Sequence, residues 1–125
     1  MDARTIPEDT QTLVVQYLNV VNTALDRHRE DFPYNKILSL SQRVLAGKNI
    51  GMGVYKGEAK SAYDYYTLSM DDGRLRLVSH GKTDADLEFK ARLSYLEEVV
   101  ENDAEYIEHP VKLDWEWLKT RLGIS

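Results

Sequence analysis

The chain contains no cysteine, only three histidines and no long hydrophobic run. Without cysteine it can form no disulfide, no thiolate nucleophile and no Cys-based zinc site, which fits a reducing compartment. Its apolar runs fall well short of the ~18 residues that a membrane-spanning helix needs. The N-terminal segment, MDARTIPEDT, also lacks the apolar core of a signal peptide. We therefore expect a cytoplasmic protein without membrane association.

The composition is that of a soluble protein, and its charges are segregated along the chain. The 125 residues are 42% hydrophobic and 30% charged, which predicts a single domain spanning 1–125. Residues 1–35 carry 3 basic and 6 acidic side chains, residues 36–82 carry 8 and 4, and residues 83–125 carry 5 and 11. The middle is thus basic and both ends are acidic. A net charge of -5 argues against a nucleic-acid partner, because that affinity rests mainly on Lys and Arg.

The first third of the chain has the three- and four-residue hydrophobic spacing of helices. Thr5-Ile6-Pro7-Glu8 has the form of a capping box and predicts a helix over 7–31 that ends before Pro33. Asn35 is predicted to cap a second helix, which Gly47 terminates. The two helices should form a hairpin.

From Ile50 onward the pattern alternates and predicts strands at 50–57, 62–70, 74–80 and 86–93. Short turns favour an antiparallel meander. Asp72-Gly73 suits a type I′ turn, whose central residues both need positive φ. That turn pairs Met70 with Leu75, Leu68 with Leu77, Tyr66 with Ser79 and Tyr65 with His80. In this register Leu68 faces the core and Thr67 faces away from it. Leu68→Ala should therefore lower the free energy of unfolding by about 2–5 kcal/mol, and Thr67→Ala should lower it far less.

The last third of the chain returns to helical spacing. Residues 86–93 could begin a helix, but Ser94-Tyr95-Leu96-Glu97 is a second capping box and favours a strand before it. A helix is expected over 95–108, ended by Pro110, and Asp114 should cap a short last helix. The predicted fold is α+β, in the order ααββββαα: an N-terminal helical hairpin, a four-stranded antiparallel meander sheet and two C-terminal helices.

Three motifs resemble known site patterns, and each has a simpler structural interpretation. Gly51-Met52-Gly53 followed by Gly57 has neither the spacing nor the strand-to-helix order of a dinucleotide loop, so close backbone approach is favoured. Gly81-Lys82-Thr83 matches the end of a Walker A motif, but no helix is expected after it. Glu101, Glu105 and His109 have a spacing that could chelate a cation, but a solvated acidic helix face explains the glutamates without a metal and is favoured. We predict no cofactor and no metal.

The sheet face opposite the core is the strongest candidate site, because Tyr and Arg combine apolar area with directional hydrogen bonding. Tyrosines that only stiffen the sheet, or a last helix folded over the face, would explain the pattern equally well. Trp115 and Trp117 point to different sides of a helix, which leaves Trp117 as an exposed anchor or as packing against the first helix. The predicted binding residues are Tyr55, Tyr63, Tyr65, Arg76, His80, Arg92 and Trp117.

Two functions follow from this surface. The first is a small protein-interaction module of the binding, adaptor or inhibitor type, which uses the sheet face for a protein partner or for self-association. The alternative is a small-molecule-binding domain, with a pocket of Tyr, His and Arg on the sheet for an anionic or aromatic ligand and with weak enzymatic activity if a helix covers it. His80 opposite Tyr65 would be an acid/base pair, but a flat sheet face does not exclude water, so no catalytic set is evident.

Overall fold

A computed structural model describes residues 10–122. It is an α+β fold in which helices flank a four-stranded mixed sheet with the strand order β3-β2-β1-β4. The elements are α1 (Thr10–Arg27), α2 (Tyr34–Val44), β1 (Ile50–Tyr55), β2 (Asp64–Asp71), β3 (Arg74–His80), β4 (Leu87–Arg92), α3 (Leu93–Glu101), α4 (Asp103–Glu108), the 3-10 helix η1 (Pro110–Lys112) and α5 (Glu116–Leu122). The predicted capping box at residues 5–8 lies outside the described residues.

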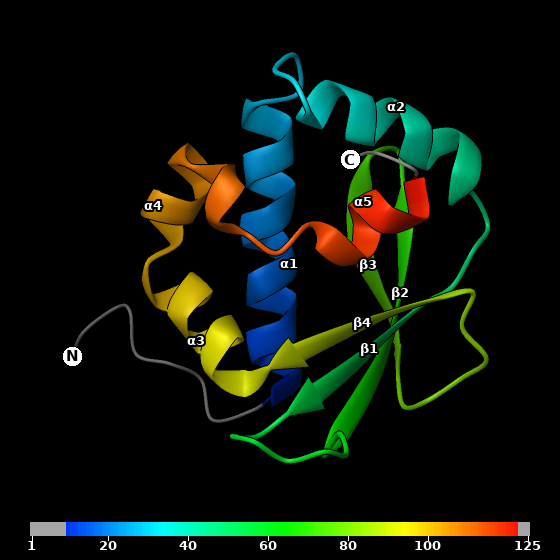
Figure 1. Ribbon diagram of the computed structural model, residues 1–125, viewed down its shortest axis with the longest axis vertical. Helices are drawn as coiled ribbons and strands as arrows, with labels where there is room; N and C mark the ends of the chain where they lie inside the picture. Colours follow the sequence, from blue (N-terminus) through cyan, green and yellow to red (C-terminus); the bar gives the residue numbers. More distant parts are fainter. Residues whose placement is uncertain (1–9, 123–125) are drawn as a thin grey trace.

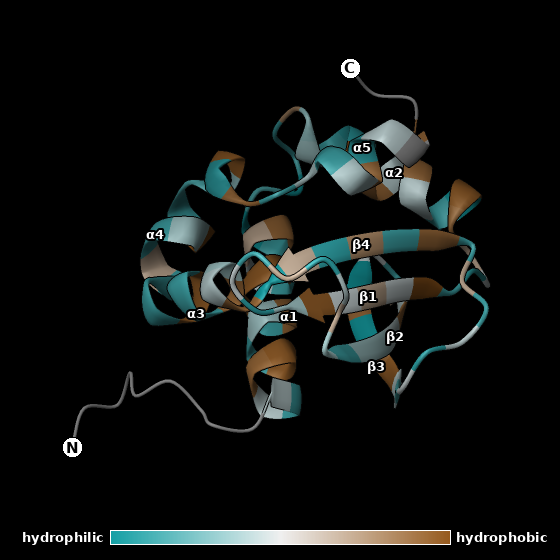
Figure 2. Cartoon of the chain, turned by 60° about the horizontal axis from the view of Figure 1, so that its bottom comes forward, coloured by the Kyte–Doolittle hydropathy of each residue, from teal (hydrophilic) through white to brown (hydrophobic). Residues whose placement is uncertain are grey.

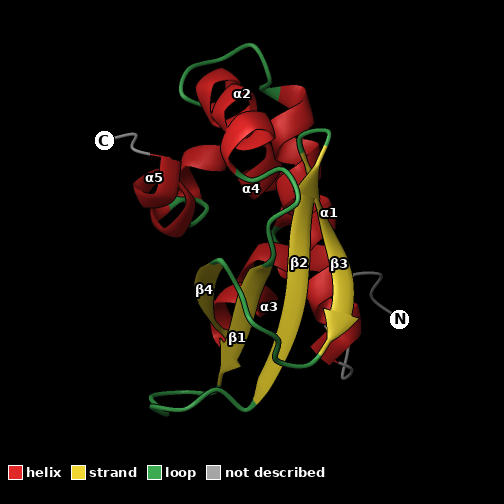
Figure 3. Ribbon diagram, turned by 90° about the vertical axis from the view of Figure 1, so that its right-hand side faces the viewer, coloured by secondary structure: helices red, strands yellow, loops and turns green. Residues whose placement is uncertain are grey.

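The predicted antiparallel meander is wrong at its last strand. β1, β2 and β3 pair antiparallel as expected, but β4 pairs parallel with β1 at the opposite edge from β3. α1 packs against β3 and bonds to the outer edge of that strand at Leu75: the Asn22 side chain donates to the Leu75 carbonyl at 2.9 Å and accepts from the Leu75 amide at 2.7 Å. α1 thus occupies the place at this edge, and β4 adds to β1 instead. Figure 3 shows the connection from β3 to β4 passing over one face of the sheet.

The hairpin register is confirmed near the turn and wrong beyond it. Asp72 and Gly73 have φ of 52° and 75°, as the predicted turn requires. Met70 pairs with Leu75 and Leu68 with Leu77, but a bulge then leaves Val78 unpaired. As a result Tyr66 pairs with His80, not with Ser79, and His80 moves to the core side of the sheet.

The core lies between one face of the sheet and the helices. α1 crosses the centre of the molecule, with the sheet on one flank and α3 and α4 on the other (Figure 1). Hydrophobic and hydrophilic residues alternate along β4, as the sequence predicted for this strand (Figure 2). The buried side chains that join the two layers include Leu13, Val14, Leu25, Ile37, Ile50, Met52, Leu68, Phe89 and Leu118. No helix within 10–122 has the length and apolar character to cross a bilayer.

The helix boundaries differ from the prediction at the caps. α1 ends at Arg27, short of the expected 31, and α2 begins at Tyr34, so Asn35 lies inside its first turn. α3 begins directly after β4 at Leu93, which leaves Ser94 within the helix. Asp114 does accept a hydrogen bond from the Glu116 amide at 3.1 Å, as predicted for the start of the last helix.

The helix predicted over 95–108 is divided at Asn102. α3 ends at Glu101 and α4 begins at Asp103. The Asn102 side chain donates to the Glu98 carbonyl and carboxylate, and its backbone leaves the helical region at φ -114° and ψ 40°. Such local side-chain bonds compete with continuation of a helix.

Candidate functional site: the open face of the sheet

The face of the sheet opposite the core, called the open face here, carries the side chains of Tyr55, Tyr65, Thr67, Glu88, Lys90 and Arg92. Residues 81–86, the crossing loop, run over it from β3 to β4. Thr67 lies beneath this loop: its Oγ1 is 2.8 Å from Thr83 Oγ1 and donates to the Gly81 carbonyl at 3.3 Å. Only 3% of Thr67 is exposed. The sheet is therefore covered on both faces at this point.

Two glycines of β1 allow neighbouring groups to approach the open face. A Cβ at Gly51 would lie 3.0 Å from the Ala85 Cβ in the crossing loop. A Cβ at Gly53 would lie 3.2 Å from the Tyr55 ring and 3.4 Å from the Tyr65 ring. These contacts agree with the interpretation of Gly51 and Gly53 as sites of close backbone approach.

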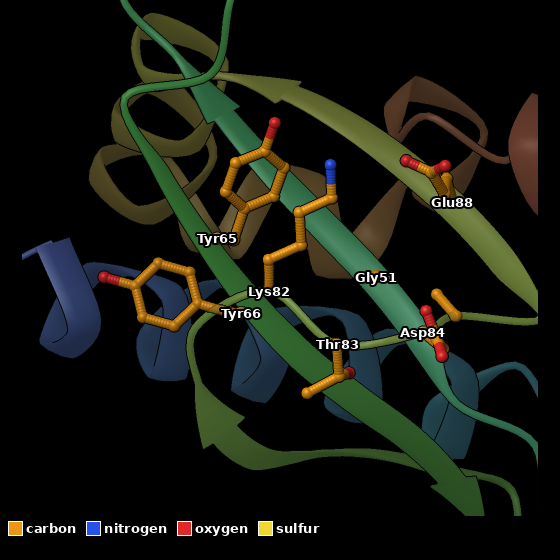
Figure 4. Close-up of a pocket in the computed structure, with 8 residues that line it drawn as sticks. Gly51, Tyr65, Tyr66, Lys82, Thr83, Asp84 and Glu88 are labelled. Atoms are coloured by element: carbon orange, nitrogen blue, oxygen red, sulfur yellow. The ribbon is translucent and has the colours of Figure 1, made fainter.

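A hollow of about 220 Å³, called the smaller hollow here, opens beside the crossing loop, above Gly51 (Figure 4). The Lys82 ammonium lies 5.0 Å from the centroid of the Tyr65 ring, and Asp84 and Glu88 line the same hollow. Gly81-Lys82-Thr83 thus belongs to a loop between two strands. No helix begins after it, so it cannot hold a phosphate in the manner of a Walker A loop.

A second hollow of about 420 Å³, called the larger hollow here, lies at the other end of β1, between β4 and the loop over 56–60. Tyr55 and Arg92 are register partners on adjacent strands and both line it. Lys60 and Lys90 add two further cations, and Glu58 is a carboxylate in the lining. Arg92 Nη1 also donates to the Gly57 carbonyl, which ties the loop to the end of β4.

The predicted site residues therefore separate into groups. Tyr55, Tyr65 and Arg92 come together on the open face. Arg76 lies toward the hairpin turn, where its Nη2 is 2.8 Å from Asp71 Oδ2. Tyr63 precedes β2 with 40% of its surface exposed, and its hydroxyl is 2.6 Å from Thr10 Oγ1.

His80 does not lie beside Tyr65, so the predicted acid/base pair is wrong. Its ring stacks on Tyr66 with centroids 4.7 Å apart, and its Nε2 is 2.7 Å from Asp64 Oδ1. The Tyr66 hydroxyl donates to the other carboxylate oxygen at 2.8 Å. Burial alone would raise the pKa of Asp64, but the hydrogen bonds from His80, Tyr66 and the Tyr65 amide outweigh it and lower that pKa. The bulge at Val78 causes this rearrangement.

Trp117 is not the exposed anchor that was predicted. Its ring stacks on Phe89 with centroids 4.7 Å apart and an angle of 15°, and its side chain is half-buried. Phe89 is a core residue of β4, so α5 packs on the core side and leaves the tyrosines of the open face uncovered.

The acidic spacing in the C-terminal third does not form one continuous face. Glu101 ends α3, whereas Glu105 belongs to α4 and His109 follows it. Glu105 is paired with Lys112 at 3.2 Å. Within the described residues, no three acidic or histidine side chains are arranged to hold a metal ion.

Sequence reasoning missed Lys60 and Lys82. Both lie in connections between strands, where hydrophobic alternation gives no information about the face of the sheet on which a side chain lies. The excess of basic residues over 36–82 was the available signal, since both belong to it.

Comparison with protein-family models, with curated protein sequences and with solved structures finds no match for this chain.

Proposed function

We propose that the protein binds a small molecule on the open face of the sheet. One observation carries the proposal: this face is hollowed at two places along β1, at Gly51 and at Tyr55, with Gly53 between them. Ligand sites are concave and combine aromatic surface with a few polar groups, whereas protein interfaces of ordinary size are flatter and wider. Tyr55 and Tyr65 supply the aromatic surface, and the charged side chains around them supply the polar groups.

The burial of Thr67 supports the same conclusion. A solvated sheet face would leave this threonine exposed, but the crossing loop encloses it. The loop forms a wall of the smaller hollow, and the 56–60 loop forms a wall of the larger one. Connections that pass over a sheet and leave hollows beneath them create lined, concave sites.

The test is an NMR titration of the ¹⁵N-labelled protein with three probes that share one ring and differ in charge: phenol, benzylamine and phenyl phosphate. We expect at least one probe to shift the amides of Gly53, Tyr55 and Tyr65 in a saturable way. Amides of α1 and α4, on the far side of the sheet, are the internal control. If none of the three shifts the open face up to its solubility limit, the proposal is wrong.

A protein-interaction module is the second candidate, supported by the placement of charge. Glu98, Glu101 and Glu105 are exposed on α3 and α4, on the opposite flank of α1 from the sheet (Figure 1). The open face carries Lys90 and Arg92. A second copy could thus set its acidic helices against this face. Because the two surfaces lie on opposite flanks, this contact is head-to-tail and does not close as a dimer. Light scattering at low salt would then give masses above that of the monomer that rise with protein concentration, and raising the salt to 0.5 M would return the monomer. A monomer under both conditions would contradict self-association.

A further inference from the structure

We infer that the larger hollow is the anion-binding part of the open face, and that its ligand group is a phosphate monoester. The inference rests on the proposed function and deepens it by naming the chemical class. It depends on the juxtaposition of Lys60, Lys90 and Arg92 around one hollow of about 420 Å³.

The charge of this hollow is unbalanced. Three cationic side chains line it against one carboxylate, Glu58, so the lining carries two net positive charges. Among the described residues, no carboxylate lies within 4.0 Å of the Lys60, Lys90 or Arg92 cations. Two exposed cations elsewhere are paired, Arg76 with Asp71 and Lys112 with Glu105. The larger hollow thus brings three cations without a carboxylate partner to one concave surface.

A phosphate monoester matches this charge. It carries about -1.5 to -2 at pH 7 and three acceptor oxygens, whereas a carboxylate carries a single charge. The Arg92 guanidinium has five N–H donors, and among residues 10–122 it makes one hydrogen bond, to the Gly57 carbonyl, so donors remain for a ligand. The ammonium groups of Lys60 and Lys90 add charge from the loop and from β4.

The organic part of the ligand has a path along β1. Tyr55 lines the hollow, and its ring and that of Tyr65 both lie within 3.4 Å of the position that a Cβ at Gly53 would take. From Tyr55 to Gly51 the distance along the strand is roughly 13 Å at about 3.3 Å per residue. The smaller hollow at Gly51 has mixed charge, with Lys82 beside Asp84 and Glu88. It therefore does not compete for the phosphate.

The experiment measures the dissociation constant of phenyl phosphate by NMR for wild type, Lys90→Gln and the matched control Lys48→Gln. Lys90 is exposed and makes no ion pair with the described residues, so its replacement should preserve the fold. Lys48 is an exposed lysine before β1, at the opposite end of that strand from the larger hollow, and its substitution changes the net charge equally. We expect a tenfold or greater loss of affinity for Lys90→Gln, and a change below twofold for Lys48→Gln.

Two further probes, benzoate and inorganic phosphate, test the chemical class of the ligand. Benzoate carries a single negative charge on the same ring, and inorganic phosphate lacks the ring. Phenyl phosphate should bind more tightly than either of them. Equal affinity of benzoate and phenyl phosphate would overturn the assignment of a phosphate monoester. Equal affinity of phenyl phosphate for wild type and both variants would overturn the anion site, and the proposed function would stand. If no probe binds the open face, the proposed function itself fails.

Discussion

At the scale of the residue, the environment of Thr67 in the structure differs from the one that the sequence predicts. Alternation along β2 places it on the face away from the core, and the sequence therefore predicts an exposed threonine that tolerates alanine. In the structure it is buried beneath the crossing loop and bonded to Gly81 and Thr83. A buried hydroxyl with two partners contributes to stability, and its removal deprives the Gly81 carbonyl of this donor beneath the loop.

We accordingly predict that Thr67→Ala lowers the free energy of unfolding by about 1–3 kcal/mol, and Leu68→Ala by about 2–5 kcal/mol. Ser69→Ala is the matched control, because Ser69 is half-buried and bonds only to the nearby Asp71 carboxylate. Urea unfolding of the three variants measures the effects. A Thr67→Ala variant as stable as Ser69→Ala would mean that the crossing loop does not cover β2.

At the scale of the element, the crossing loop carries the chain from β3 over the sheet to β4. β3 ends at the level of Met52 and β4 begins at the level of Ile50, so six residues suffice to pass over β2 and β1. The path requires a residue without a side chain at position 51, where the Ala85 Cβ comes within 3.0 Å of the position a Cβ would take.

The contact between Gly51 and Ala85 gives a double-mutant cycle. Gly51→Ala should lower the free energy of unfolding by about 1–3 kcal/mol, because the added methyl group would collide with that of Ala85. Ala85→Gly removes one of them, so Gly51→Ala should be close to neutral in the Ala85→Gly background. Thermal unfolding of the two single variants and the double variant measures the coupling. Additive effects would show that the loop does not rest on β1.

At the scale of the whole molecule, the buried Tyr17 and the half-buried Tyr95 join separate layers of the fold. The Tyr17 hydroxyl is 3.1 Å from that of Tyr95, and Tyr95 in turn accepts from the Asp114 amide at 2.8 Å. α1, α3 and the segment before α5 are thereby linked. Burial raises the pKa of Tyr17 well above its ordinary value of 10, with a further contribution from Tyr95.

The raised pKa predicts alkaline destabilisation. Above pH 10 the unfolded chain loses the Tyr17 proton while the folded protein keeps it, so the stability present at neutral pH falls as pH rises. Tyr17→Phe should be less stable than wild type at pH 8, because it loses the bond to Tyr95, and should decline less steeply between pH 10 and 11. Urea unfolding at these pH values is the measurement. Parallel declines for the two proteins would contradict the assignment.

The sequence by itself determined the class of the fold, most element positions and the hairpin turn. These are local properties: hydrophobic spacing places Val14 and Tyr17 inward, alternation places Phe89 and Ala91 inward, and Asp72-Gly73 dictates a tight turn. The same alternation predicted that Tyr55, Tyr65 and Arg92 lie on the face of the sheet opposite the core.

Only the tertiary structure decided which strand β4 joins and which side chains surround each hollow. A short polar loop can turn back or cross over at similar local cost, and the local sequence does not show that α1, far away in the chain, packs against β3 and bonds to its edge at Leu75. The bulge at Val78 reversed the facing of His80, because the side-chain period of a strand is two and one extra residue inverts it. Lys60 and Lys90 meet at one hollow only because the loop before β2 folds back over β4.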